Sequence, residues 1–404
     1  MRILMIAPEP FFQPRGTPFS EYYRARALTE LGHEVDMVTY PIGEDVSIPG
    51  LRIFRTPALP GVRDVPIGPS LTKIPLDGMV FASSVRRLMS ERYDLLDCHE
   101  EAGLMGVLLS RLFGVPTVYD MHSSLPEQLG NFRFSHSALL RRLFALSERW
   151  AIRGSAAVIV ICPYLEEVVA KVDAERPCFL IENSPLAEAT ESVREDEIAA
   201  LRKSHGLEGF VVIGYTGTFE AYQGIELLLD AVRWVIGQDD RVRLLMVGGN
   251  ADQIRRAQEA VREKQLESKV VFAGQRPPAE MPTYLAATDI LVSPRSRGYN
   301  TPLKIYSYLR AGKPIVATRL LTHTQVLDDE IAELTAAEPE AFGRGILTLI
   351  RDPQRAGSLA DHARRRAEER YTYERYLEKT RRALDFLSRT AEPEKAVPRQ
   401  APSP

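Results

Sequence analysis

Three cationic side chains fall within one short segment of the chain: Arg295, Arg297 and Lys304. An apolar run over Asp289–Val292 precedes them, another follows over Pro314–Ala317, and a helix is expected between, over Pro302–Arg310. A strand, a loop, a helix and a strand in this order form a βαβ unit, which binds ligands at the carboxyl ends of its strands. Since the N–H groups at a helix N-terminus attract anions, the segment predicts a site for a diphosphate.

Two glycine-rich turns lie earlier in the same half of the chain. Gly217, Thr218 and Gln223 follow the apolar run Val211–Tyr215, and Gly248 follows Val242–Val247. Glycine lets the backbone approach a ligand closely, although a plain strand-to-helix turn explains Gly248 equally well.

The loop after the first apolar run, Arg2–Ala7, carries Arg15 and Gly16. Gly16 permits close backbone approach and Arg15 supplies positive charge, which favours a ligand-facing loop. A helix-opening turn that begins with proline is the alternative.

His122 follows the apolar run Thr117–Tyr119, at the carboxyl end of that predicted strand. A histidine there can donate to a ligand hydroxyl or titrate near neutral pH, with Asp120 either orienting it or capping the loop. His99 and Glu100 follow an earlier predicted strand. They either line a second ligand site or form a hydrogen-bonded polar pair at a helix start.

The composition limits the class of protein. A length of 404 residues predicts two domains, and 45% hydrophobic with 26% charged residues is typical of a soluble globular enzyme. The net charge of −3 gives no attraction to nucleic acid. Scattered cysteines without CxxC spacing indicate reduced thiols, and no apolar run spans a bilayer, so we expect a cytoplasmic protein.

Strand and helix patterns alternate up to Cys178–Ile181 and begin again at Val211, which predicts two doubly wound α/β domains. We place the first domain at residues 1–185 and the second at 186–371, with an acidic linker at its start. A final helix, Tyr373–Ser388 within 372–390, has apolar residues at helical spacing. Residues 391–404 are rich in proline and charge and are expected to be disordered.

Several of these segments, in the same order, resemble glycosyltransferase family 4. The clearest is Lys304-Ile-Tyr-Ser-Tyr-Leu-Arg-Ala-Gly-Lys-Pro-Ile-Val-Ala-Thr318, and the segment Tyr215–Ala231 matches the family's loop and helix at that point. The resemblance implies the GT-B fold, in which two Rossmann-like domains face across a cleft and the last helix returns to the first domain. It also implies retaining transfer from a nucleotide sugar.

On this resemblance, His122 contacts the transferred sugar. From their charge and their place at the start of the predicted helix, Lys304 and Arg297 are expected to neutralise the leaving diphosphate. The other donor-binding candidates are Arg15, Gly16, Gly217, Thr218, Gln223, Gly248, Tyr299, Asn300, Thr301, Pro302, Leu303 and Ser307. The chain departs from the family at several of them. It lacks the usual Arg and Lys at Thr218 and Gln223, and the usual pair of Glu at Tyr299 and Ser307.

The expected function is transfer of a hexose from a nucleotide diphosphate sugar to an acceptor hydroxyl. No pair of aspartates of the DxD kind lies in a donor-side loop, so we predict neither a metal nor a cofactor. Two alternatives stay open: a related sugar-nucleotide epimerase or hydrolase, and a degenerate, non-catalytic nucleotide-sugar-binding protein.

The stretch Arg133–Gly154 combines arginines with Leu, Phe and Trp. It fits either an amphipathic helix on an anionic membrane or a core-facing helix with a solvated basic side. We favour the second because Glu148 dilutes the charge, and keep a peripheral membrane contact as the alternative.

Overall fold

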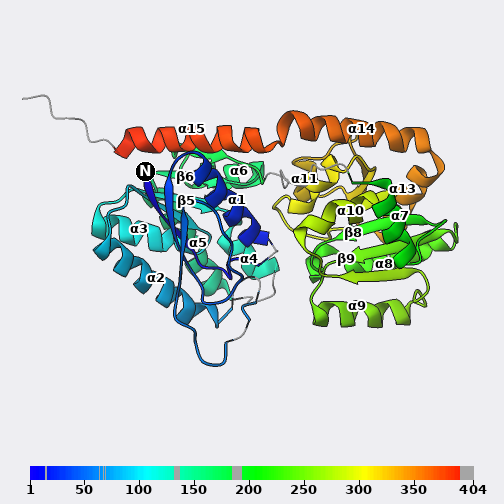
Figure 1. Ribbon diagram of the computed structural model, residues 1–404, viewed down its shortest axis with the longest axis horizontal. Helices are drawn as coiled ribbons and strands as arrows, with labels where there is room; N and C mark the ends of the chain where they lie inside the picture. The colour runs from blue at the N-terminus through cyan, green and yellow to red at the C-terminus, as the bar shows by residue number, and fades with distance from the viewer. Residues whose placement is uncertain are drawn as a thin grey trace, which may run out of the picture.

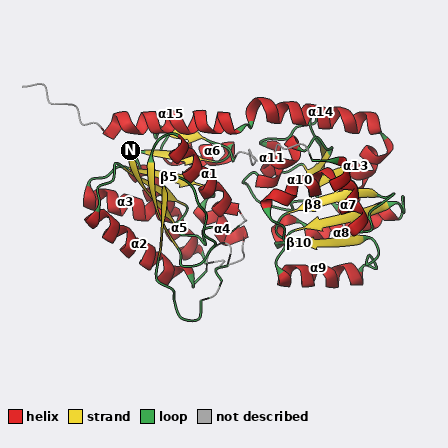
Figure 2. Cartoon of the chain, in the orientation of Figure 1, coloured by secondary structure: helices red, strands yellow, loops and turns green. Residues whose placement is uncertain are grey.

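The computed structural model describes residues 1–13, 16–62, 64–66, 68, 70–131, 137–183 and 193–391. Two α/β bodies lie side by side, and the last two helices run along one side of both (Figure 1). In each body the strands lie between helices (Figure 2). We call the bodies the N-terminal domain and the C-terminal domain.

The N-terminal domain contains a parallel sheet of seven strands in the order β3-β2-β1-β4-β5-β6-β7. The strands are β1 (Arg2–Ala7), β2 (Glu34–Thr39), β3 (Leu51–Arg55), β4 (Leu95–His99), β5 (Thr117–Met121), β6 (Ala157–Val160) and β7 (Cys178–Leu180). The central strand β1 is almost continuously apolar and buried, as expected where helices cover both faces. The strand order reverses between β1 and β4, the point at which open α/β sheets bind ligands.

Helices cover both faces of this sheet. α1 (Gly16–Glu30) and α15 (Tyr373–Ala391) pack on one face. The other face is covered by α2 (Lys73–Ser90), α3 (Ala102–Phe113), α5 (Ala138–Gly154) and α6 (Pro163–Val172), and α4 (Leu125–Asn131) follows β5.

The C-terminal domain has the same kind of architecture, with a sheet of six parallel strands in the order β10-β9-β8-β11-β12-β13. The strands are β8 (Val211–Thr216), β9 (Val242–Val247), β10 (Val270–Gly274), β11 (Ile290–Ser293), β12 (Ile315–Thr318) and β13 (Glu333–Thr335). The helices are α7 (Glu195–Ser204), α8 (Ile225–Ile236), α9 (Ala251–Glu263), α10 (Met281–Ala286), α11 (Leu303–Arg310), α12 (Leu321–Thr324), α13 (Pro339–Arg351) and α14 (Pro353–Arg370). Here the strand order reverses between β8 and β11.

The chain returns to the N-terminal domain through α15, which follows α14 after a short break (Figure 1). Tyr376, Leu384 and Leu387 are buried in the same core cluster as Ile3 of β1. Thr380 Oγ1 accepts a hydrogen bond from Arg24 Nη1 at 3.1 Å. The predicted returning helix is therefore confirmed.

Two doubly wound domains were predicted correctly, with strand ends that differ by a residue or two. β3 and α2 were not among the predicted elements. The boundary at residues 185 and 186 and the tail 392–404 lie outside the described residues, so these remain predictions. No helix within the described ranges is long and apolar enough to cross a membrane.

Candidate active site

The two domains touch through loops at the carboxyl ends of their strands. Asn300 Nδ2, in the loop between β11 and α11, donates to the backbone oxygen of His122 at 2.6 Å. The rings of Tyr164 and Tyr299 stack with centroids 4.9 Å apart. These contacts bring the segment after β5 against the loop that precedes α11, so the predicted sugar-contacting and diphosphate-binding residues share one region.

Lys304, in the first turn of α11, has no carboxylate partner among the described residues. Its Nζ is buried, has no hydrogen-bond partner among the described residues, and lies 3.9 Å from the ring centroid of Tyr215. Burial, with a smaller effect from Arg295, lowers the pKa of Lys304 well below its ordinary value. A buried cation without an anion is costly, so this position favours an incoming negative charge.

Arg295 is the second cation of the site. Its Nη1 donates to the backbone oxygen of Asn300 and to Thr322 Oγ1, both at 2.6 Å, and its buried Nε has no hydrogen-bond partner among the described residues. Burial lowers the pKa of Arg295. Within the described ranges no carboxylate acts on either Arg295 or Lys304 as an ion-pair partner.

Arg297 differs from Lys304 and Arg295, and its predicted role stays a prediction. Its side chain is exposed. The loop turns at Gly298, where φ is +118°, and the Arg295 guanidinium folds back beneath that turn, 3.3 Å from the position of a Cβ on Gly298. Arg295, rather than Arg297, therefore lies against this turn.

The glycine turns pack against each other beside Lys304. A Cβ on Gly217 would lie 3.5 Å from Lys304 Nζ, and a Cβ on Gly248 would lie 2.2 Å from the Gly217 oxygen. Both glycines have positive φ, +126° and +116°, so a side chain at either is strained. The structure therefore brings Gly217, Gly248 and Lys304 together.

The remaining donor-side candidates differ in exposure. Thr218 is half-buried and its backbone oxygen accepts from Tyr215 Oη at 2.6 Å, whereas Gln223 is buried with an unpartnered Oε1 among the described residues. Ser307 is half-buried, one turn after Lys304 on α11. The other predicted residues of this loop are Tyr299 (exposed), Asn300 (half-buried), Thr301 and Pro302 (buried), and Leu303 (half-buried).

In the first loop, Gly16 begins α1 with a φ of +33°. Arg15 lies outside the described residues, so its predicted role stays a prediction.

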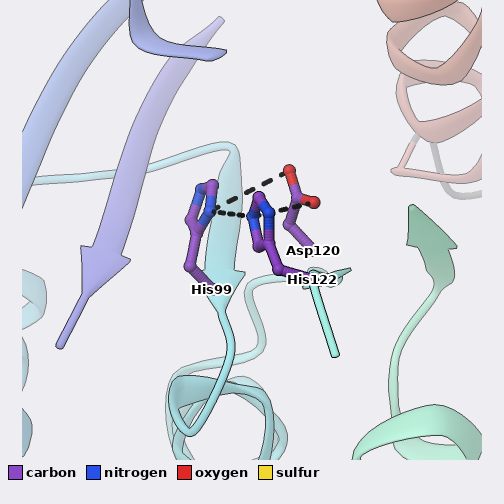
Figure 3. A group of neighbouring side chains, drawn as sticks. All are labelled: His99, Asp120 and His122. Atoms are coloured by element: carbon purple, nitrogen blue, oxygen red, sulfur yellow. Dashed lines mark hydrogen bonds and ion pairs between the residues drawn. The ribbon is translucent and has the colours of Figure 1, made fainter. Parts of the chain in front are cut away.

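His122 belongs to a buried polar chain (Figure 3). Its Nε2 lies 3.1 Å from His99 Nδ1 and 3.3 Å from Asp120 Oδ1. Asp120 Oδ2 accepts from Arg24 Nε at 2.8 Å. The chain therefore runs from α1 through the end of β5 to the domain interface.

The charges of this chain follow from its surroundings. Burial lowers the pKa of His99, but Asp97 and Asp120 outweigh burial and raise it to about 9. Burial raises the pKa of Asp120, but Arg24 and the histidines outweigh it and lower it to about 2. Burial lowers the pKa of His122 to about 4, although Asp120 opposes this. Near neutral pH these shifts favour the cationic form of His99, the anionic form of Asp120 and the neutral form of His122.

Two contacts of Nε2 bear on the tautomer of His122. A protonated His99 donates through Nδ1 to His122 Nε2 and so favours a His122 proton on Nδ1, whereas Asp120 Oδ1, 3.3 Å from the same Nε2, favours a proton on Nε2. That Nδ1 is buried without a hydrogen-bond partner among the described residues. Nδ1 is therefore the ring nitrogen of His122 that is available to a ligand hydroxyl.

A second buried acidic group lies beside this chain. Neither carboxylate oxygen of Glu21, on α1, has a hydrogen-bond partner in the described part of the chain, and burial raises its pKa to about 8. Glu100 is also buried and accepts from Ser123 Oγ at 3.0 Å. Sequence reasoning missed Glu21 and Thr322, because nothing in the pattern separates them from solvated helix residues.

Two domain families match the chain. The model described as "Glycosyl transferase 4-like domain" matches residues 23–180, and that described as "Glycosyl transferases group 1" matches residues 211–352. Each match falls on one of the two sheets.

Individual relatives match over most of their length. The phosphatidyl-myo-inositol mannosyltransferase of Mycobacterium leprae is 25% identical over 371 residues, which cover 87% of this chain and 88% of that one. The 2-deoxystreptamine N-acetyl-D-glucosaminyltransferase of Streptomyces fradiae is 29% identical over 260 residues, which cover 62% of this chain and 61% of that one.

Solved structures share the architecture. Sucrose-phosphate synthase from Thermosynechococcus elongatus superimposes with a TM-score of 0.81 at 21% identity, covering 96% of this chain and 99% of that one. Anabaena HepE in complex with UDP superimposes with a TM-score of 0.75 at 20% identity, covering 95% of this chain and 100% of that one. With both halves matched by family and the fold matched throughout, the chain belongs to glycosyltransferase family 4 and has the GT-B fold.

Proposed function

We propose that this glycosyltransferase moves a hexose from a nucleotide diphosphate sugar to an acceptor hydroxyl, with retention and without a divalent metal. The observation that carries the proposal is the pair of cations Lys304 and Arg295 near the N-terminal end of α11. Among the described residues neither has a carboxylate partner, and Lys304 Nζ and Arg295 Nε have no hydrogen-bond partner. A helix N-terminus and two buried cations match a diphosphate in charge and in hydrogen bonding.

The donor site takes its parts from both domains. Lys304, Arg295 and the first N–H groups of α11 bind the diphosphate, and the turn at Gly217 lets it approach closely. Nδ1–H of His122 donates to a hydroxyl of the sugar. Related solved structures support a nucleotide-sugar donor, since HepE has been seen with UDP and with UDP-glucose.

Retention needs no side-chain nucleophile in this arrangement. The bond between the anomeric carbon and the phosphate oxygen breaks, and the acceptor oxygen attacks from the same face. The departing phosphate oxygen takes the proton of the acceptor hydroxyl. Lys304 and Arg295 stabilise the negative charge that develops on the diphosphate.

The chemistry of the first-domain cluster supports metal independence. His99, Asp120 and His122 are residue types that bind metals, and their ligand atoms lie within 4.8 Å of one another. Arg24 already pairs with Asp120, and His99 is a cation at neutral pH. This cluster is therefore poorly suited to a further cation, and the diphosphate is neutralised by side chains.

A thermal-shift screen with UDP-, GDP- and ADP-sugars tests the proposal. A true donor at about 100 times its Kd should stabilise the protein by about 2.7 kcal/mol. Turnover of that donor should then require an acceptor. Rapid turnover without one would indicate an epimerase or hydrolase, and binding without turnover a binding protein. No stabilisation by any nucleotide sugar would refute the donor site.

A further inference from the structure

The N-terminal domain exposes an unusual amount of apolar surface on one side. Of the eleven large apolar side chains that are exposed among the described residues, nine lie between Leu71 and Trp150. Six of them define what we call the α3–α5 face: Leu108, Leu112, Leu139, Leu143, Leu146 and Trp150.

On α5 these residues recur at helical spacing on the side away from the core. Leu139, Leu143, Leu146 and Trp150 are between 44% and 68% exposed, whereas the side that faces the sheet includes Ile152, which is fully buried. The helix thus has two apolar sides, of which the sheet covers one. The sequence-based interpretation, a core-facing helix with a merely basic outer side, was therefore incomplete.

α3 continues the same surface. Leu108 and Leu112 stand one turn apart on its outer side. The two helices are in close contact, because a Cβ on Gly154 at the end of α5 would lie 2.5 Å from Val107 Cγ1 on α3. The two sets of leucines therefore lie on neighbouring helices.

The exposed charges on these two helices are all positive: Arg111, Arg141, Arg142, Arg149 and Arg153. The one carboxylate, that of Glu148, is buried and accepts from the backbone N–H of Leu125 at 2.8 Å. Glu148 was expected to dilute the positive charge, but its side chain points inward. A chain with a net charge of −3 therefore presents a basic, apolar face here.

We propose that the α3–α5 face docks on an anionic lipid bilayer. Leucine and tryptophan side chains enter the interfacial region while the flanking guanidinium groups pair with lipid phosphates. A second copy of the chain fits poorly, because joining two such faces would oppose ten arginines without an exposed carboxylate on either pair of helices. Docking is a binding property, so it can be tested independently of the proposed transfer reaction.

The face is physically linked to the active site. Leu125, whose N–H binds Glu148 of α5, lies three residues after His122. The docked helix α5 therefore supports the loop that carries His122. Docking would hold the active site close to the lipid surface.

Flotation with phosphatidylcholine vesicles, with and without phosphatidylglycerol, tests the docking. The full-length protein should float only with the anionic vesicles, and less at high salt. Each arginine should contribute a factor of about five to partitioning, so the double variant Arg142→Gln/Arg149→Gln should lose about 25-fold. Leu143→Ser/Trp150→Ser should lose at least tenfold, by roughly the transfer free energy of partly buried apolar side chains.

Matched controls are available in the C-terminal domain. Arg256→Gln on α9 and Leu321→Ser on α12 remove an exposed arginine and an exposed leucine, and both should float like the wild type. Because the four changed α5 side chains point outward, both α5 double variants should melt like the wild type, which separates lost docking from misfolding. No flotation, equal flotation on neutral vesicles, or unaffected α5 variants would overturn the proposal. Self-association that the α5 variants abolish, without flotation, would assign the face to a second copy instead.

Discussion

Replacing Lys304 with methionine should change stability and activity in opposite directions. The methionine keeps most of the side-chain volume but removes a charge whose Nζ is buried without a hydrogen-bond partner in the described part of the chain. Without ligand, the wild type carries the cost of an unsatisfied buried group, about 1–3 kcal/mol, so Lys304→Met should unfold at a higher temperature. When a nucleotide is bound, the same charge should attract the diphosphate and strengthen binding.

The magnitude of the loss follows from electrostatics. A unit charge about 4 Å from a phosphate charge, at an effective dielectric constant of about 20, contributes about 4 kcal/mol. Removing one electrostatic donor of this kind typically costs about 2.7–4 kcal/mol in the transition state, or about 10²–10³-fold in rate. We expect kcat/KM of Lys304→Met to fall by that factor, with kcat affected more than KM.

The dependence on pH gives an independent check of the same charge. Because burial lowers the pKa of Lys304, the unfolded chain holds this proton more tightly than the folded chain. The stability of the ligand-free wild type should therefore rise with pH up to about 10.4, the ordinary pKa of lysine, and Lys304→Met should lack this component.

The assay is thermal unfolding of wild type and variant, with and without UDP, followed by steady-state transfer kinetics. Arg297→Met is the matched control, since it removes an exposed cation from the preceding loop. Arg297→Met should retain nearly wild-type values, whereas Arg295→Met should resemble Lys304→Met in activity. The reasoning is refuted if Lys304→Met is less stable than wild type without ligand and is still stabilised fully by UDP.

Three further predictions follow from the geometry. Gly248→Ala should abolish stabilisation by UDP and destabilise the protein by about 1–3 kcal/mol, because the new Cβ would meet the Gly217 oxygen at 2.2 Å. As a control, Gly357→Ala on α14, where nothing lies within 4 Å of the new Cβ, should be neutral or stabilising in the same thermal-unfolding assay. The pKa of His99 is raised to about 9, so its stabilising contribution should be complete below about pH 6.5 and lost as the pH rises through 9; NMR titration of wild type beside His99→Gln would test this, and a His99 pKa near 6.5 would contradict it. A chain ending at Thr390 should fold normally, while one ending at Glu369 should lose cooperative unfolding because Tyr376, Leu384 and Leu387 fill the N-terminal core; equal stability of the two would refute this.

The fold was largely predictable because its signals are local and repeated. Apolar runs that end at glycine or polar loops located the unit β11–α11–β12 to within a residue, and the spacing of Tyr376, Leu384 and Leu387 located the returning helix. β3 escaped prediction because it is an edge strand whose residues are only half buried, so its apolar signal is weak.

The site was predictable only in part, because the spacing of residues in the sequence does not determine which way a side chain points in an irregular loop. Arg295 and Arg297 are two residues apart, and the left-handed turn at Gly298 decides which of them folds inward. Asp120 was a candidate partner of His122 from the sequence, but Arg24 was not, since Arg24 and Asp120 are 96 residues apart and meet only when α1 packs on the sheet.

A crystal structure with UDP tests the central claim most directly. We predict that the diphosphate lies at the N-terminal end of α11, with its oxygens in contact with Lys304 Nζ and the Arg295 guanidinium and with Gly217 beside it. Phosphates bound elsewhere, with Lys304 still buried and unpaired, would contradict the proposed donor site.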